Sequence, residues 1–331
     1  MEERPIPAGV ARCLETLRRA GHGAYPVGGC VRDLLLGRTP GDYDVCTSAR
    51  PEQVTALFAR TVPTGIKHGT VTVLTEDGPV EVTTFRREGG YADGRHPDGV
   101  AFDVGLTEDL ARRDFTVNAM ALGEEGEVID PFGGQADLEE GLIRCVGDPD
   151  RRFGEDALRM LRAVRFAAQL GFAIHPETEE AIRRNAPRVA LVSGERIKVE
   201  MEKTLLSPRP ERAGDLLRWG LLAHLWPERN CPDLTGLKDL PPLPIPRWRG
   251  FCTATGFPIE CLPVERTLRR GVRHPEEEVL HRLALSGGEL AALGLEGREI
   301  GTAQRKLALH VLDHPEDNRR ERLLEVLTKL D

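Results

Sequence analysis

The sequence lacks the long apolar runs of a membrane protein, since no uninterrupted stretch approaches the ~20 residues that span a bilayer. It lacks an apolar signal segment after its acidic start, and its seven cysteines include no C-x-x-C pair. We therefore expect a soluble, cytoplasmic protein with reduced thiols and without a zinc site or a disulfide framework. Neither a G-x-x-x-x-G-K-[ST] loop nor a G-x-G-x-x-G fingerprint occurs, which disfavours the nucleotide-binding folds that use them.

Positive charge is also scarce, with 45 Lys and Arg against 53 Asp and Glu, and a net charge of −8 argues against a nucleic-acid partner. The charge is unevenly distributed, however. Residues 1–150 carry 15 basic and 26 acidic side chains, whereas residues 151–220 carry 14 and 10. An acidic first part is thus joined to a basic, Arg-rich second part, which offers local positive charge despite the negative total.

Strand patterns are confined to the first part of the chain. We predict an opening helix around 10–17, and strands over 24–27, 42–46, 70–74 and 79–85. We therefore expect an α+β fold with a small, mixed but mostly antiparallel sheet, rather than a doubly wound nucleotide fold.

After about residue 150 the pattern changes to amphipathic helices, and strand patterns become rare. The first of these helices are predicted over 155–170, 176–185 and 193–206, and a proline-rich connection over 241–246. We divide the chain into residues 1–150, 151–220 and 221–331.

Asp42 and Asp44 are the first candidates for chemistry, because residues i and i+2 of a strand project from the same face. Two such carboxylates can hold a hard divalent cation such as Mg²⁺ against a substrate phosphate. The alternative is a solvated strand edge or turn. If the strand over 79–85 is a neighbour, Glu81 becomes a third acid, as general base or metal ligand, although an exposed strand glutamate is an equal alternative.

An anion site is predicted ten residues earlier. Gly28 and Gly29 precede a helix start, where a phosphate can approach the backbone, and Arg32 on its first turn can clamp that phosphate. An ordinary glycine turn with a surface arginine is the alternative. Further along, Arg113 can neutralise phosphate charge and Asn118 can bind a ribose hydroxyl, while Asp114 can simply cap the helical turn.

The helix predicted over 155–170 carries the last candidates. Asp156 and Arg159 are i, i+3 neighbours on such a helix and can together read the edge of a nucleobase, or form an ordinary surface salt bridge. At about 100° per residue, Arg162 is rotated from Arg159, and Arg165 lies nearly opposite Asp156. Arg162 and Arg165 are therefore better suited to phosphate contacts or helix packing than to contact with the nucleobase that Asp156 and Arg159 would bind.

These strings resemble the class II tRNA nucleotidyltransferases, which include CCA-adding enzymes and bacterial poly(A) polymerases of the polymerase β-like superfamily. The matching segments are Val27-Gly28-Gly29-Cys30-Val31-Arg32-Asp33, Asp42-Tyr43-Asp44, Arg112 to Met120, Glu155 to Ala167, and Glu195-Arg196-Ile197 with Glu200 and Lys203. They cover about residues 20–205 in order.

The resemblance implies a nucleotidyltransferase head followed by an all-α neck, body and tail. It implies template-independent addition of C, C and A to the 3′ end of tRNA from CTP and ATP, with Mg²⁺ at Asp42 and Asp44 and tRNA as the partner through its 3′ end and acceptor arm. It assigns Gly29 and Arg32 to the triphosphate and Asp156 and Arg159 to the base. Further nucleotide contacts are assigned to Arg113, Arg162 and Arg165. The oligomeric state stays open.

The same resemblance leaves related activities to be distinguished. The glycine-rich loop over 86–105 looks intact and disfavours an enzyme that adds only the two cytidines. An A-adding enzyme and a poly(A) polymerase remain alternatives. Nucleotidylation of a small molecule would explain Asp42 and Asp44 but not Asp156, Arg159 or the long helical remainder. A binding protein with a decayed head is disfavoured by the intact acidic and arginine motifs.

Overall fold

The computed structural model describes residues 6–89, 99–228 and 231–328. The chain divides into two compact units, Met1–Cys231 and Pro232–Asp331. None of the helices in the described ranges is long and apolar enough to cross a membrane. All seven cysteines are free thiols, and Cys13, Cys30, Cys46 and Cys145 are buried.

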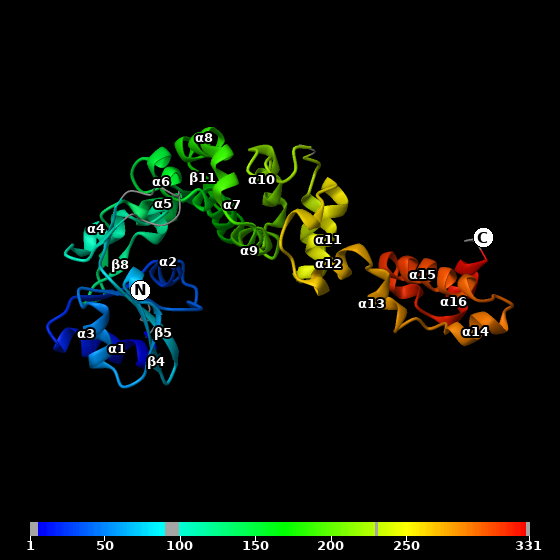
Figure 1. Cartoon of the computed structure of the whole chain (residues 1–331), viewed down its shortest axis with the longest axis horizontal. Coiled ribbons are helices and arrows are strands. Elements are labelled where there is room, and N and C mark those ends of the chain that lie inside the picture. Colours follow the sequence, from blue (N-terminus) through cyan, green and yellow to red (C-terminus); the bar gives the residue numbers. More distant parts are fainter. Residues whose placement is uncertain (1–5, 90–98, 229–230, 329–331) are drawn as a thin grey trace. The chain divides into compact units, whose positions relative to one another are not determined.

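A mixed sheet forms the first part of the first unit, with strand order β3-β4-β5-β2-β1-β8-β9 in the described residues (Figure 1). β2 and β5 are parallel, and all other neighbours are antiparallel, so the predicted α+β fold is confirmed. The strands are β1 (Ala24–Val27), β2 (Asp44–Thr47), β3 (Thr61–Gly65), β4 (Thr70–Thr75), β5 (Gly78–Thr84), β8 (Ala121–Leu122) and β9 (Val128–Ile129).

Alternating valines give this sheet its buried face. Val45, Val73 and Val82 lie on one side of β2, β4 and β5, and helices α1 (Ala8–Arg19) and α3 (Pro51–Leu57) pack against them. Because successive strand residues face opposite ways, Asp44 and Glu81 are directed to the other side of the sheet, where the candidate site lies.

The other side of the sheet is covered in part by short elements. They are α2 (Gly29–Leu35), α4 (Leu106–Ala111) and the 3₁₀ turn η2 (Thr116–Asn118). Leu110 of α4 packs with Cys46 and Phe85. The predicted loop over 86–105 begins and ends in a two-stranded stem of β6 (Arg87–Glu88) and β7 (Val100–Ala101), while its residues 90–98 lie outside the described residues.

Helices make up most of the rest of the first unit, with α7 packed against α9 and α6 against α8. The prediction of a helix over 155–170 was wrong at its start, because an extended Asp156 separates α6 from α7. The helices are α5 (Gly134–Glu140), α6 (Pro149–Glu155), α7 (Leu158–Leu170), α8 (Pro176–Asn185), α9 (Gly194–Leu205) and α10 (Ala213–Arg218), with η3 (Ala186–Leu191) and η4 (Pro210–Arg212). The short strands β10 (Leu142–Ile143) and β11 (Ala173–Ile174) pair in parallel.

The second unit contains only helices among its described residues. α11 begins at Pro244, inside the proline-rich segment, because a proline in the first helical turn loses no intrahelical hydrogen bond. The elements are η5 (Thr235–Asp239), α11 (Pro244–Thr255), η6 (Ile259–Cys261), α12 (Arg266–Arg273), α13 (Glu276–Leu280), α14 (Gly287–Ala292), α15 (Arg298–Asp313), η7 (Pro315–Asp317) and α16 (Arg320–Leu327).

Candidate active site

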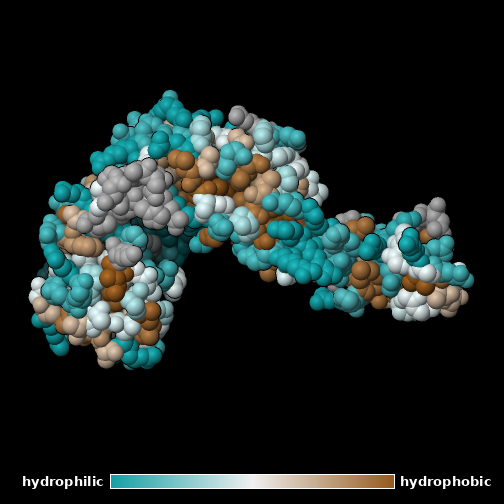
Figure 2. Space-filling view, viewed as in Figure 1, coloured by the Kyte–Doolittle hydropathy of each residue, from teal (hydrophilic) through white to brown (hydrophobic). Residues whose placement is uncertain are grey.

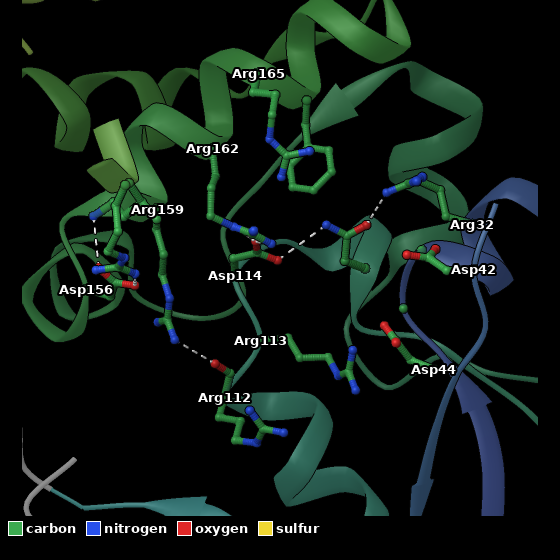
Figure 3. Close-up of a pocket in the computed structure, with 16 residues that line it drawn as sticks. Arg32, Asp42, Asp44, Arg112, Arg113, Asp114, Asp156, Arg159, Arg162 and Arg165 are labelled. Carbon is green, nitrogen blue, oxygen red and sulfur yellow. Dashed lines mark hydrogen bonds and ion pairs between the residues drawn. The ribbon is translucent and has the colours of Figure 1, made fainter. Parts of the chain in front are cut away.

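A cavity of about 490 Å³ lies within the first unit, between the polar side of the sheet and the start of α7 (Figure 3). It brings together all but one of the residues predicted to form the site. These residues are Gly28, Gly29, Arg32, Asp42, Asp44, Arg113, Asn118, Asp156, Arg159, Arg162 and Arg165. The exception is Glu81, which does not line this cavity.

The glycine turn leads from β1 into α2. Gly28 has a φ of 77°, a conformation that favours glycine, and its N–H donates to the Met120 carbonyl at 3.1 Å. A Cβ atom at this position would lie 2.8 Å from Nη1 of Arg113. The backbone angle therefore favours glycine at position 28, and a side chain there would also displace the guanidinium of Arg113.

Asp42 and Asp44 line the floor of the cavity, but only Asp44 belongs to a strand. The predicted strand started two residues too early. Val27, the last residue of β1, pairs with Asp44, and the chain turns at Gly28 immediately afterwards. Asp42 therefore has no residue of β1 opposite it. The shared face of the two carboxylates therefore does not come from strand alternation.

The carboxylates interact electrostatically. Burial, and then the charges of Asp42 and Glu81, raise the pKa of Asp44 to about 6, while Arg113 acts in the opposite direction. Glu81 is the register partner of Asp44 on the parallel strand β5, as predicted for neighbouring strands, and its side chain is exposed. This local concentration of negative charge is relieved by binding a cation.

The donor chemistry fits a hard divalent cation. The described residues contain no group of three or more His, Cys, Asp or Glu side chains arranged to hold a metal. Protein ligands would therefore come from Asp42 and Asp44, and substrate phosphates and water would supply the rest. Mg²⁺ is commonly held by one or two carboxylates together with substrate phosphates.

Arg113 points into this acidic corner of the cavity (Figure 3). Its Nη2 is 3.5 Å from Asp109, a fully buried carboxylate that also holds Arg112 at 2.8 Å. The Nε of Arg113 is buried and has no hydrogen-bond partner in the described residues. Asp109 anchors both arginines, and sequence reasoning missed it because nothing distinguishes it from an ordinary helix acid.

Asn118 and Asp114 connect the two sides of the cavity. The amide oxygen of Asn118 accepts from Arg32 at 2.6 Å, and its amide nitrogen donates to Asp114 at 3.3 Å. Asp114 also accepts from the backbone N–H of Phe115 and from Arg162, at 2.9 and 2.7 Å. Burial acts to raise the pKa of Asp114, but the charge and hydrogen bonds of Arg162 outweigh it and lower this pKa to about 2.

Asp156 and Arg159 both line the cavity, but they do not form the predicted i, i+3 pair of one helix. Asp156 precedes α7, and its carboxylate accepts a hydrogen bond from the Leu158 N–H at 3.0 Å. It also accepts hydrogen bonds from Nη1 and Nη2 of Arg196, at 3.2 and 2.7 Å. Arg159 instead binds Glu155 at 2.7 Å. The family motifs around Glu155 and Glu195-Arg196 contain both of these partners, although neither was selected as a site residue.

The break at Asp156 also changes the expected position of Arg165. It was placed nearly opposite Asp156 on the assumption of a continuous helix, whereas both side chains line the same cavity. Arg165 binds Glu200 at 2.5 Å and Gln169 at 2.9 Å, and it is buried. Helix packing therefore accounts for part of its role.

Comparison with known proteins supports a relationship along most of the chain. Residues 24–144 match the family model described as a poly(A) polymerase head domain, and residues 171–231 match a probable RNA- and SrmB-binding site of polymerase A. The crystal structure of the Bacillus stearothermophilus CCA-adding enzyme in complex with CTP is 38% identical, with a TM-score of 0.75, and the match covers 93% of this chain and 79% of that one. The chain belongs to the family of class II CCA-adding enzymes.

Two curated members of this family show the extent of the likeness. The CCA-adding enzyme of Anoxybacillus flavithermus is 50% identical over 74% of this chain and 63% of its own length. The enzyme of Geobacillus stearothermophilus is 53% identical over 64% of this chain and 53% of its own length. The matches therefore span between half and two thirds of these relatives. The Thermotoga maritima CCA-adding enzyme, at 21% identity and a TM-score of 0.64 over 99% of this chain, shares the fold.

Proposed function

We propose that this chain adds C, C and A to the 3′ end of tRNA without a nucleic-acid template, using CTP and ATP and releasing pyrophosphate. The observation that carries the proposal is the single cavity that joins the Asp42 and Asp44 carboxylates to an arginine-lined wall. Transfer of a nucleotide needs a metal site, a polyphosphate site and a base site within the length of one nucleotide, and this cavity contains candidates for all three.

In the proposed reaction, the RNA 3′ hydroxyl oxygen bonds to the α-phosphorus of CTP or ATP. The bond between this phosphorus and the oxygen that bridges to the β-phosphate breaks, and pyrophosphate leaves. Mg²⁺, when bound, supplies a positive charge that lowers the pKa of the attacking hydroxyl and neutralises the phosphate oxygens. Asp42 and Asp44 would hold this ion. We assign Glu81, beside Asp44, to accept the hydroxyl proton or to act as a further ligand.

Binding of the triphosphate is assigned to the arginines and the glycine turn. Seven arginines and four aspartates line the cavity, which leaves an excess of positive charge for a polyanion. Arg32 and Arg113 lie beside Gly28 and Gly29, where a phosphate can come close to the backbone. Asn118 orients Arg32 and is assigned to the ribose, for which its amide keeps one further N–H and one further acceptor site.

Base selection is assigned to Asp156 and Arg159, which can offer an acceptor and a donor fork to the edge of C or A. Arg196 fixes the carboxylate of Asp156, and Glu155 fixes the guanidinium of Arg159. The Arg196–Asp156 pair is bidentate, which limits rotation of the carboxylate and so favours a defined hydrogen-bonding pattern. The proposed base-selection site therefore consists of four side chains rather than two.

The tRNA itself is proposed to contact the helical part beyond residue 220 as well as the cavity. Helix α12 carries Arg266, Arg269, Arg270 and Arg273, and all four are exposed. Figure 2 shows a hydrophilic surface over α12 and α13. Such a cluster can bind RNA phosphates. We accordingly assign residues 1–150 to the catalytic head, 151–220 to the neck, and 221–331 to the body and tail, in a protein acting on cytoplasmic tRNA.

The proposal is tested with three transcripts of one tRNA that end before CCA, after C and after CC. Each is incubated with purified chain, Mg²⁺ and CTP, ATP or both, and the added nucleotides are resolved at single-nucleotide resolution. We expect C addition to the first two transcripts, A addition to the third, and complete CCA with both nucleotides. AMP addition to the third transcript alone would identify an A-adding enzyme, long A tracts a poly(A) polymerase, and no incorporation would reject the proposal.

A further inference from the structure

Phe166, on the cavity side of α7, is surrounded by three guanidinium groups. The Cζ atoms of Arg165, Arg162 and Arg32 lie 4.0, 5.3 and 5.4 Å from the centre of its ring. Phe166 is 6% exposed and lines the cavity. An aromatic face attracts cations within about 6 Å of the ring centre, and more strongly where water is excluded. Arg32 comes from α2, whereas the other two come from α7, so one ring joins both sides of the cavity.

The three arginines have anchors along their edges. Asp114 binds Nε and Nη2 of Arg162. Glu200 and Gln169 bind Nε and Nη1 of Arg165, and Asp33 and Asn118 bind Arg32. Within the described part of the chain, Nη1 of Arg162 and Nη2 of Arg165 have no hydrogen-bond partner. These contacts lie along the edges of the guanidinium groups, and a contact with an aromatic face adds a constraint on the tilt of each guanidinium plane.

The ring itself is held in place. Phe115, which is fully buried, packs against Phe166 with 5.8 Å between the ring centres and 80° between the ring planes. This T-shaped contact is a preferred arrangement of aromatic pairs, and it fixes the direction of the Phe166 face. Phe166 therefore stands as an oriented apolar platform within a strongly basic cavity.

We propose that Phe166 is a positioning residue for the triphosphate, which holds Arg32, Arg162 and Arg165 so that their remaining N–H groups converge on the same phosphates. The inference rests on the proposed function. Without the ring, like-charged guanidinium groups repel one another and turn toward solvent or toward Asp114 and Glu200. A triphosphate would then have to reorder them on binding, and its affinity would fall.

The test compares Phe166→Leu, which keeps most of the apolar volume but removes the aromatic face, with Phe166→Tyr, which keeps that face. Phe153→Leu is the matched control, because Phe153 is also buried in a neck helix but makes no cation–π contact in the described residues. Affinities of the full chain for inorganic tripolyphosphate and for CTP are measured by titration calorimetry in EDTA, where only the protein's own groups bind the phosphates. Steady-state constants for CTP addition to tRNA are measured separately with Mg²⁺.

We expect Phe166→Leu to weaken tripolyphosphate and CTP binding about tenfold and to raise the KM for CTP similarly, with kcat changed about twofold or less. Phe166→Tyr and Phe153→Leu should retain wild-type affinity. The inference is overturned if Phe166→Leu binds as well as wild type, or if Phe153→Leu loses as much affinity. If wild type binds neither ligand in EDTA, the inference is overturned. If wild type also fails to extend tRNA with Mg²⁺, the proposed function fails with it, whereas a failure at Phe166 alone leaves that function standing.

Discussion

Asp114 is a buried carboxylate whose charge should stabilise the first unit. It is 7% exposed, and it receives hydrogen bonds from Arg162, Asn118 and the Phe115 backbone. Asp114→Asn preserves the shape and one acceptor oxygen but removes the charge and leaves Arg162 without its carboxylate. We expect the variant to fold and to be less stable near neutral pH.

The magnitude follows from the pKa of Asp114, which falls from its usual 3.8 to about 2 in the folded chain. Each unit of difference corresponds to about 1.4 kcal/mol, so the ionised side chain contributes roughly 2 kcal/mol to the free energy of unfolding. Because the folded pKa is the lower one, this contribution is present above pH 3.8 and is lost as the pH falls toward 2.

Urea unfolding of wild type and Asp114→Asn from pH 7 to pH 2.5 measures this contribution. Both proteins carry Trp248→Phe, so that fluorescence reports on Trp219 and Trp226, which lie in the first unit. We expect a gap of roughly 2 kcal/mol at pH 7 that narrows below about pH 4. Asp150→Asn is the control, because Asp150 pairs with Arg184 at the surface and should change stability little. A gap that is absent at pH 7, or constant down to pH 2.5, would refute the reasoning.

Three further variants probe the cavity. Gly28→Ala should lower nucleotide transfer at least tenfold, because the new methyl group strains the φ of 77° and displaces Arg113. Gly29→Ala, whose Cβ would lie 3.6 Å from Arg32, should lower transfer less, and an equal loss of transfer in the two variants would contradict this prediction. Arg196→Gln should weaken discrimination between correct and incorrect nucleotides about tenfold by freeing Asp156, as measured by kcat/KM ratios, whereas the surface variant Arg184→Gln should not. Asp44→Asn should abolish transfer but increase the free energy of unfolding in EDTA at pH 7, because the raised pKa of Asp44 means that its ionisation opposes folding. This gain in stability should shrink as the pH falls from 6 toward 3.8, and a loss of stability would contradict the prediction.

Much of the sheet could be predicted because its residues alternate in a simple way. The strand over 24–27 was predicted with its observed bounds, and the pair over 70–74 and 79–85 within about a residue, since alternating valines and the Glu76-Asp77 turn leave few other arrangements. β3 was missed because its five residues, Thr61 to Gly65, are mostly exposed and carry no clear apolar alternation. β8 and β9, at two residues each, are too short to give a periodic pattern.

The set of cavity residues was also predictable, but their pairing was not. Motif residues identified nearly all of the lining, whereas the break at Asp156 depends on the carboxylate capping α7 and binding Arg196, forty residues away. Helical periodicity continues across this break, so a local pattern cannot reveal it. Asp109 is a buried acid that a sequence pattern does not distinguish from a surface acid. Glu200 belongs to a motif, but its pairing with Arg165 is a tertiary contact that the motif does not reveal.

We propose that the cavity lined by Asp42, Asp44 and the arginines of the first unit builds a CCA end without a template. This proposal is tested most directly by incubating the purified chain with Mg²⁺, CTP, ATP and a tRNA transcript that lacks CCA, and sequencing the RNA 3′ ends. We predict that wild type adds CCA and then stops, and that Asp42→Ala adds nothing while keeping the wild-type circular dichroism spectrum. Unextended tRNA with wild type, or CCA ends made by Asp42→Ala, would contradict the account.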